Sequence, residues 1–212
     1  YRVYEDEQVA AKFPGLVDSA SIIGGVQIQS RAGLGGNLCN ASPSGDGIGA
    51  LIVHAATCVI AGPNGTREVP AEDFCTGPGR SVLNDGEFLV EIKMPMPQKG
   101  FGAAYERFTP RNEMDIAVAG VASSVQLDGD TIVSARVALA AVGPTPILSS
   151  AGDFLAGKKA TAENISAAAQ AASGDASPIS DMRGTAEQRI HLVGVLTRRT
   201  LERAVERARE SN

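Results

Sequence analysis

Residues 33–47 read GLGGNLCNASPSGDG, and this stretch decides how the rest of the sequence is interpreted. Glycine occupies positions 33, 35, 36, 45 and 47, so the backbone either approaches another group closely or adopts positive φ angles repeatedly. We therefore predict a loop over residues 31–47. Its N–H groups can meet an anionic oxygen, and the polar groups between Asn40 and Asp46 suit sugar or ribityl hydroxyls. A glycine-rich loop alone is equally typical of tight turns, and both interpretations stay open at this point.

The sequence on either side of this loop predicts helices before it and a helix followed by strands after it. Residues 1–30 show rough helical spacing of apolar residues, broken at Phe13-Pro14-Gly15. The apolar run that follows the loop ends at a Gly-Pro-Asn-Gly turn, and Pro95 and Pro97 end the last strand of this half. The segments predicted here are a helix then a strand within 48–62 (strand 57–61), a return strand at 67–69 and a strand at 87–94.

The second half of the sequence predicts an antiparallel sheet packed with helices. Asp128-Gly129-Asp130 is a compact hairpin signal between two strand-like runs. The final segment repeats apolar residues at helical spacing and carries charges on its other faces. The predicted segments are strands 101–108, 116–127 and 131–142, a helix at 161–173 that Gly174 ends, and a helix at 185–210. The fold class is therefore α+β, with a domain boundary near residue 98.

Composition excludes several classes of function. The chain has 212 residues, 43% of them hydrophobic, and a formal net charge of −5. A negative chain is a poor partner for nucleic acid or anionic membranes, which select basic surfaces. Its apolar runs are too short and too interrupted to span a bilayer, and we expect no signal sequence at its start. We expect a soluble, cytoplasmic protein.

The cysteines and histidines give no metal-binding or nucleophilic pattern. Cys39, Cys58 and Cys75 form no Cys-x-x-Cys pair, so we expect three reduced, mostly buried thiols, and any iron–sulfur centre would lie on another chain. His54 and His191 are the two histidines, and each is more typical of a packed or surface residue than of a catalyst. We expect no catalytic residue and no metal ligand in this chain.

Three acidic residues lie beside loops or element ends. Asp46, Asp115 and Asp181 occupy such positions, where carboxylates commonly accept hydrogen bonds from free backbone N–H groups. A capping role is favoured over a functional one for each of them.

Three segments together resemble a known family. Residues 34–46 (LGGNLCNASPSGD) resemble the second flavin-contacting segment of the medium subunit of molybdenum hydroxylases, the group that includes xanthine and carbon monoxide dehydrogenases. Residues 108–117 (FTPRNEMDIA) resemble the entry to the C-terminal domain of that subunit, and residues 179–189 (ISDMRGTAEQR) resemble its closing helix. The three matches occur in the expected order and cover nearly the whole chain.

The resemblance implies an FAD site between two subdomains. By position, the backbone at Gly33, Gly35 and Gly36 would approach the phosphate and ribityl region of the cofactor. Asn37 would support that loop, and Asp46 would contact cofactor hydroxyls.

Two further residues and the domain organisation follow from the same resemblance. Leu89 would pack on the isoalloxazine, and Arg107 would lie near the flavin ring and stabilise its electron-rich reduced form. Gly33 departs from the family, which usually has Thr or Ser there. The expected domains are the second part of the FAD-binding domain at 1–98 and the C-terminal flavoprotein domain at 99–212. The subdomain that opens the family, with its own Gly-Gly loop, is expected to be lacking before Tyr1.

The resemblance also implies an electron-transfer role. Such a subunit receives electrons from [2Fe-2S] clusters on a small subunit, which accepts them from a molybdenum cofactor on a large subunit, and its FAD passes them to an external acceptor. The alternative is a truncated platform that binds partners but has no cofactor and no redox activity. Poorly covered sheet edges in the first half predict self-association when partners are absent.

Overall fold

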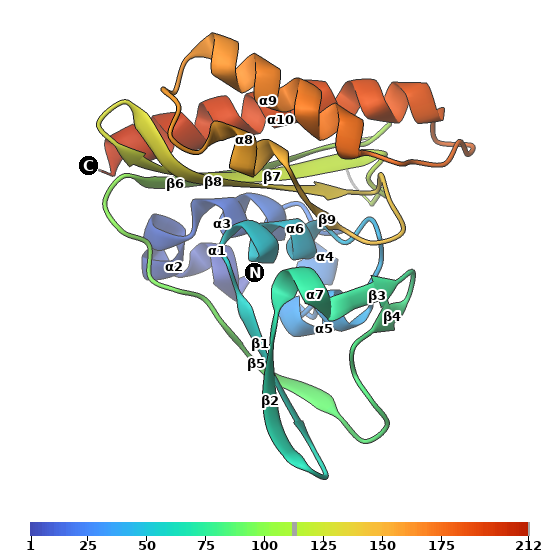
Figure 1. Ribbon diagram of the computed structural model, residues 1–212. Helices are drawn as coiled ribbons and strands as arrows, with labels where there is room; N and C mark the ends of the chain where they lie inside the picture. Colours follow the sequence, from blue (N-terminus) through green and yellow to red (C-terminus); the bar gives the residue numbers. More distant parts are fainter. Residues whose placement is uncertain (112–113, 212) are drawn as a thin grey trace.

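The computed structural model describes residues 1–111 and 114–211. Residues 1–53 are mostly helical, as predicted for residues 1–30 (Figure 1). Asp6 begins the second helix by accepting hydrogen bonds from the N–H groups of Gln8 and Val9, and Pro14 occupies the first turn of the third. The helices of this half are α1 Arg2–Glu5, α2 Glu7–Lys12, α3 Pro14–Ala20, α4 Val26–Gln29, α5 Leu34–Cys39 and α6 Asp46–Val53.

The glycine-rich stretch is more ordered than predicted. The prediction of a loop over residues 31–47 is wrong, because α5 lies inside this range and α6 begins at Asp46. None of the glycines of this stretch has a positive φ angle. What they provide is space: a Cβ on Gly47 would lie 2.8 Å from Asn37 Oδ1 and 2.9 Å from Leu34 Cδ1. The glycines therefore allow α5 to pack directly on α6.

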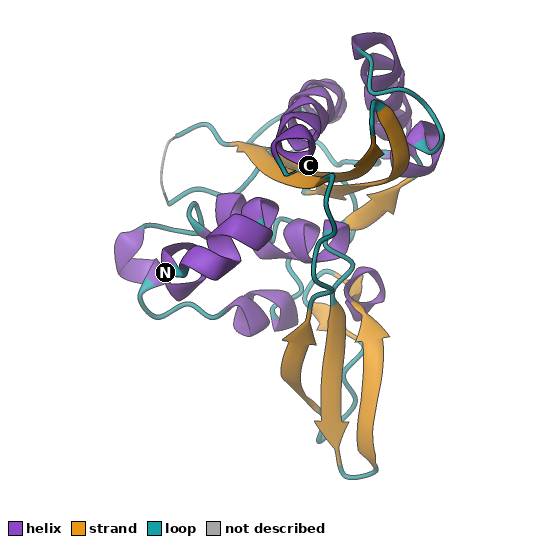
Figure 2. Cartoon of the chain, turned by 90° about the vertical axis from the view of Figure 1, so that its left-hand side faces the viewer, coloured by secondary structure: helices purple, strands orange, loops and turns teal. Residues whose placement is uncertain are grey.

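An antiparallel arm of three strands follows α6 and projects from the helical layer (Figure 2). Its strand order is β2-β1-β5, and the predicted hairpin and the predicted strand at 87–94 are confirmed. Cys58 and Ile60 of the central strand are fully buried. The elements are β1 Thr57–Gly62, β2 Gly65–Pro70 and β5 Phe88–Lys93, with α7 Ala71–Phe74, β3 Cys75–Gly77 and β4 Arg80–Ser81 between them.

The second half contains an antiparallel sheet of order β6-β7-β8-β9. The predicted strands at 101–108 and 131–142 are confirmed, but the middle strand begins three residues later than predicted. This middle strand begins to pair at Ala119, which faces Phe108, the last residue of the strand before it. The end of that neighbouring strand therefore sets where the middle strand begins. The strands are β6 Phe101–Phe108, β7 Ala119–Asp128, β8 Thr131–Ala140 and β9 Ile147–Ser149.

Helices cover both faces of this sheet (Figure 1). Val137 and Leu139 of β8 face the C-terminal helices, whereas Ala138 between them faces α6, as the alternation of a strand requires. A Cβ on Gly102 would lie 2.0 Å from Ala204 O, so the glycine allows the last helix to touch the sheet. That layer contains α8 Ala151–Leu155, α9 Ala162–Asp175 and α10 Ala186–Glu210, of which α9 continues through the predicted stop at Gly174.

One carboxylate joins the two ends of the chain. Asp18 of α3 accepts hydrogen bonds from Nη1 (2.6 Å) and Nη2 (2.9 Å) of Arg207 on α10. It also accepts one from the backbone N–H of Tyr105 on β6 (3.1 Å). The helical layer of the first half is thereby held against the sheet of the second.

Candidate functional site

A cavity of about 440 Å³ lies against the glycine-rich stretch. Gly33, Gly36 and Asn37 line one side of it, and Ile23 and Gln29 are among the residues that line the rest. Three of the residues singled out from the sequence are therefore placed together at a concave surface, the usual setting for a small-molecule or cofactor site.

The backbone at this cavity is open. Gly33 is the N-cap of α5, and no side chain caps the N–H groups of its first turn. A Cβ added to Gly33 or to Gly36 would meet nothing within 4 Å. The glycines thus leave room for a bound group to approach the first backbone N–H groups of α5, which have no hydrogen-bond partner within the helix. These features fit the phosphate and hydroxyl oxygens of a dinucleotide such as FAD.

Gly35 and Leu89 lie together on the other side of α5. A Cβ on Gly35 would lie 3.4 Å from Leu89 Cδ2. Leu89 belongs to β5, is half-buried and pairs with Ile60 of β1. It packs against the helix and is not among the residues that line the cavity. Contact between Leu89 and a flavin ring stays a prediction.

Asn37 joins α5 to α6 as well as lining the cavity. Its Oδ1 accepts a hydrogen bond of 3.2 Å from the N–H of Gly47. This bond fixes the orientation of α5, and with it the position of the open glycines.

Asp46 and Arg107 form a buried ion pair, with Asp46 only 7% exposed. Asp46 also accepts a hydrogen bond of 2.6 Å from the hydroxyl of Tyr105, and Nη2 of Arg107 donates to the carbonyl of Ile22 at 2.9 Å. Burial raises the pKa of the Asp46 carboxyl, and the bonds from Tyr105 and Arg107 oppose that rise. The pKa of Tyr105 lies well above its ordinary value because the hydroxyl is buried beside this carboxylate. Contacts of Asp46 and Arg107 with a cofactor stay predictions.

The capping interpretation holds for two of the three acidic residues. Asp181 accepts from the N–H of Arg183 at 2.8 Å and pairs with Arg189. Asp115 accepts from the N–H groups of Arg111 and Ile116. For Asp46 the interpretation is wrong, because both of its oxygens bind side chains from β6.

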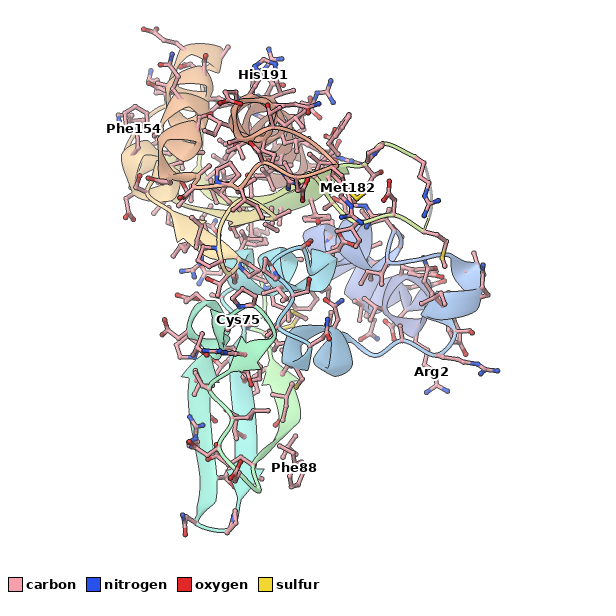
Figure 3. All side chains as sticks on the ribbon, turned by 90° about the vertical axis from the view of Figure 1, so that its right-hand side faces the viewer. Arg2, Cys75, Phe88, Phe154, Met182 and His191 are labelled. Atoms are coloured by element: carbon pink, nitrogen blue, oxygen red, sulfur yellow. The ribbon has the colours of Figure 1, made fainter. Side chains whose placement is uncertain are left out.

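The histidines are placed as expected, whereas only one of the three cysteines is fully buried. His54 is buried, and His191 is exposed on the outer face of α10 (Figure 3). All three cysteines are free; Cys58 is buried, and Cys39 and Cys75 are half-buried. Burial raises the pKa of Cys58 and of Cys75 to about 11, which keeps these thiols protonated. Within residues 1–111 and 114–211, no group of three or more possible ligands is arranged to hold a metal ion.

The sequence interpretation missed Gln29. This side chain is 6% exposed and lines the cavity. It accepts a hydrogen bond from the hydroxyl of Tyr4 (2.7 Å) and donates one to the carbonyl of Ser21 (2.8 Å). Its neighbours Val26 and Ile28 are exposed instead, so the apolar residues of α4 give no signal for a buried Gln29.

Two family models match the chain, one in each half. Residues 1–97 match the FAD binding domain in molybdopterin dehydrogenase, and residues 103–204 match the CO dehydrogenase flavoprotein C-terminal domain. The fold is therefore that of a flavoprotein subunit of an oxidoreductase. The boundary predicted at residue 98 lies between the two matched ranges and stays a prediction.

Individual relatives agree with these models. The chain is 36% identical over 197 residues to the carbon monoxide dehydrogenase medium chain of Hydrogenophaga pseudoflava, covering 92% of this chain and 68% of that one. It is 32% identical over 206 residues to the xanthine dehydrogenase FAD-binding subunit of Escherichia coli O157:H7, covering 96% and 70%.

Solved structures give the same result. A structure of carbon monoxide dehydrogenase from H. pseudoflava superposes with a TM-score of 0.93 at 34% identity, over 97% of this chain and 72% of that one. Quinoline 2-oxidoreductase from Pseudomonas putida 86 gives a TM-score of 0.88 at 29% identity, over 98% and 72%. The chain belongs to the family of FAD-binding medium subunits of xanthine and carbon monoxide dehydrogenases, which confirms the resemblance and the α+β class. Within the described residues, no helix is both long and apolar enough to cross a bilayer.

Proposed function

We propose that this chain holds FAD at the cavity beside α5 and acts as the electron-transfer subunit of a molybdenum hydroxylase. Membership of an FAD-binding family supports the choice of cofactor. The observation that carries the proposal is the open backbone of Gly33 and Gly36, where a Cβ would meet nothing within 4 Å at the wall of a 440 Å³ cavity.

The chain contributes binding and orientation. The free N–H groups of the first turn of α5 would meet cofactor oxygens, with Gly33 and Gly36 giving them room. Asn37 would hold that turn in place through its bond to Gly47. Apolar residues of the opposite wall, such as Ile23, would exclude water from the bound group.

When bound, FAD supplies an electron store that is filled from iron–sulfur clusters on a small partner subunit and emptied by an external acceptor such as NAD or a quinone. Substrate oxidation would take place at the molybdenum cofactor of a large partner subunit. In this arrangement the present chain carries no substrate-transforming residue. A cytoplasmic location is part of the same proposal.

The proposal is tested by titrating FAD into the wild-type chain and into a Gly36→Val variant. The added methyl groups would enter the cavity, and we expect the Kd for FAD to rise by about a hundredfold. Gly174→Val is the matched control, because Gly174 also has nothing within 4 Å but lies near the end of α9. Equal affinities of all three proteins would refute the assignment of the cavity. A wild-type chain that binds no FAD would favour the platform without cofactor.

A further inference from the structure

The short helix α4 is attached to the rest of the protein through one polar side chain. Val26 and Ile28 of this helix are 74% and 42% exposed, and Gln29, at 6% exposed, is its buried residue. A surface helix normally packs through a stripe of apolar residues, and glutamine is seldom buried. The attachment of α4 therefore depends on what the amide of Gln29 binds.

The amide of Gln29 joins α4 to two segments that precede it in the chain. Its Oε1 accepts a hydrogen bond from the hydroxyl of Tyr4 on α1 (2.7 Å). Its Nε2 donates one to the carbonyl of Ser21, the residue that ends α3 (2.8 Å). One bond needs the acceptor of the amide and the other needs its donor, so both halves of the group are used. An apolar side chain or a carboxylate at this position could not make both bonds.

Each of the three joined segments forms part of the wall of the FAD cavity. Gln29 lines the cavity itself. Residues close to each attachment point, on α1, around Ser21 and after α4, line it as well; they are Val3, Ala20, Ile23, Ala32 and Gly33. Three stretches of the wall are therefore held at one buried amide, and the last of them leads directly into α5.

We propose that Gln29 is a positioning residue, whose amide sets the spacing of the three wall segments through its bonds to Tyr4 and Ser21. This inference rests on the proposed function. By fixing α4, the amide also fixes Gly33, the N-cap of α5, and with it the free N–H groups that would meet cofactor oxygens. The shape of the side chain alone is not sufficient for this role, because the two bonds require a donor and an acceptor together.

Three substitutions separate the two bonds. Gln29→Met keeps the length of the side chain and removes both bonds. Gln29→Glu keeps the acceptor for Tyr4, but an ionised carboxylate cannot donate to the carbonyl of Ser21. Tyr4→Phe removes the bond to α1 and leaves residue 29 unchanged, so it tests the bridge even if a substitution at Gln29 impairs folding.

The Gln29→Glu variant can be rescued by pH. When its carboxyl is protonated, the O–H can donate to Ser21 while the carbonyl accepts from Tyr4, as the amide does. Burial favours the neutral form of a carboxyl, so the variant should resemble the wild type at about pH 5.5 and Gln29→Met at about pH 8. Two titratable groups bond to Gln29, the hydroxyl of Tyr4 and the amino group of Tyr1; the wild type retains both and so accounts for any effect of theirs.

Gln126→Met is the matched control. The Nε2 of Gln126 donates to the carbonyl of Lys99 at 2.6 Å, which repeats the bond of a glutamine amide to a backbone carbonyl. Gln126 is half-buried, and neither it nor Lys99 lines the FAD cavity. The control therefore reports the effect of losing such a bond elsewhere in the same protein.

The first readout is hydrogen exchange without FAD at the N–H groups of Ser30 and Ala32, which bond to the carbonyls of Val26 (3.2 Å) and Ile28 (2.9 Å). Relative to the wild type at the same pH, exchange should be about tenfold faster in Gln29→Met and unchanged in the control. The second readout is the Kd for FAD. It should rise about tenfold for Gln29→Met, and for Gln29→Glu at about pH 8 only. Tyr4→Phe should raise it about threefold.

Three results would overturn the inference. The first is exchange at Ser30 and Ala32 that Gln29→Met leaves unchanged, or that is equally fast in the control. The second is a Gln29→Glu variant whose FAD affinity, relative to the wild type, does not depend on pH. The third is a Gln29→Met variant with normal exchange and weakened FAD binding, which would indicate direct contact with the cofactor. A wild-type chain that binds no FAD would refute the proposed function, while the exchange data would still decide whether Gln29 holds the three segments.

Discussion

His54 should make the stability of this protein depend on pH between about pH 7 and pH 5. Its ring is 3% exposed and lies between Phe13 and Phe101, with ring centroids 5.4 and 5.5 Å away. Among the described residues, its Nε2 has no hydrogen-bond partner. Burial lowers the pKa of His54 from 6.5 to about 4, and the charge of Asp18 opposes this only in part.

The direction in which stability changes with pH follows from which state, folded or unfolded, binds the proton more readily. Because the folded-state pKa of His54 is lower than the unfolded-state value, the unfolded chain is protonated first as the pH falls. The stabilisation is complete above the unfolded-state pKa of 6.5 and is lost as the pH falls toward about 4. A depression from 6.5 to about 4 corresponds to about 3 kcal/mol in total, of which about 2 kcal/mol is lost between pH 7 and pH 5.

Urea unfolding at a series of pH values measures this loss. We expect the midpoint of the wild-type chain to fall by about 1 M between pH 7 and pH 5. His54→Gln removes the titrating group and should show a much smaller fall. His191→Gln is the matched control, because His191 is exposed on α10, and it should behave like the wild type. If all three proteins lost stability equally over this range, burial of a neutral His54 would be refuted.

Three further predictions concern packing and surface. Gly102→Ala should cost about 3 kcal/mol in the free energy of unfolding, because its Cβ would lie 2.0 Å from the carbonyl oxygen of Ala204; an unchanged thermal melt would contradict this. Asp18→Asn should cost about 2 kcal/mol by leaving Arg207 without its carboxylate, and a double-mutant cycle with Arg207→Gln should show strong coupling. The chain alone should self-associate through the open edge of β5, where Phe88 is 61% exposed (Figure 3). Light scattering should show less association for Phe88→Ser, and a monodisperse wild-type monomer would refute the last prediction.

Much of the fold could be predicted from local sequence patterns. The last helix was predictable because Val193, Leu196, Leu201 and Ala204 recur at helical spacing, and all four are buried against the sheet. The arm was predictable from its turn residues and from strand alternation. In these regions local propensity, apolar pattern and final structure agree.

The errors occurred where tertiary contacts outweigh local preference. Glycine disfavours helix, so α5 was predicted as a loop, although Leu38 is fully buried and Asn37 ties the helix to α6. The pairing of Asp46 with Arg107 joins residues that are 61 positions apart. Nothing in the sequence around either residue indicates the other as its partner, because that depends on how β6 packs against α6.

The central claim is that the cavity beside α5 holds FAD, and the most direct test is the visible absorption spectrum of the purified chain. FAD is added, the excess is removed by desalting, and the spectrum is recorded before and after dithionite. The account predicts a retained flavin spectrum that dithionite bleaches. A chain that is folded by circular dichroism but retains no flavin would contradict it.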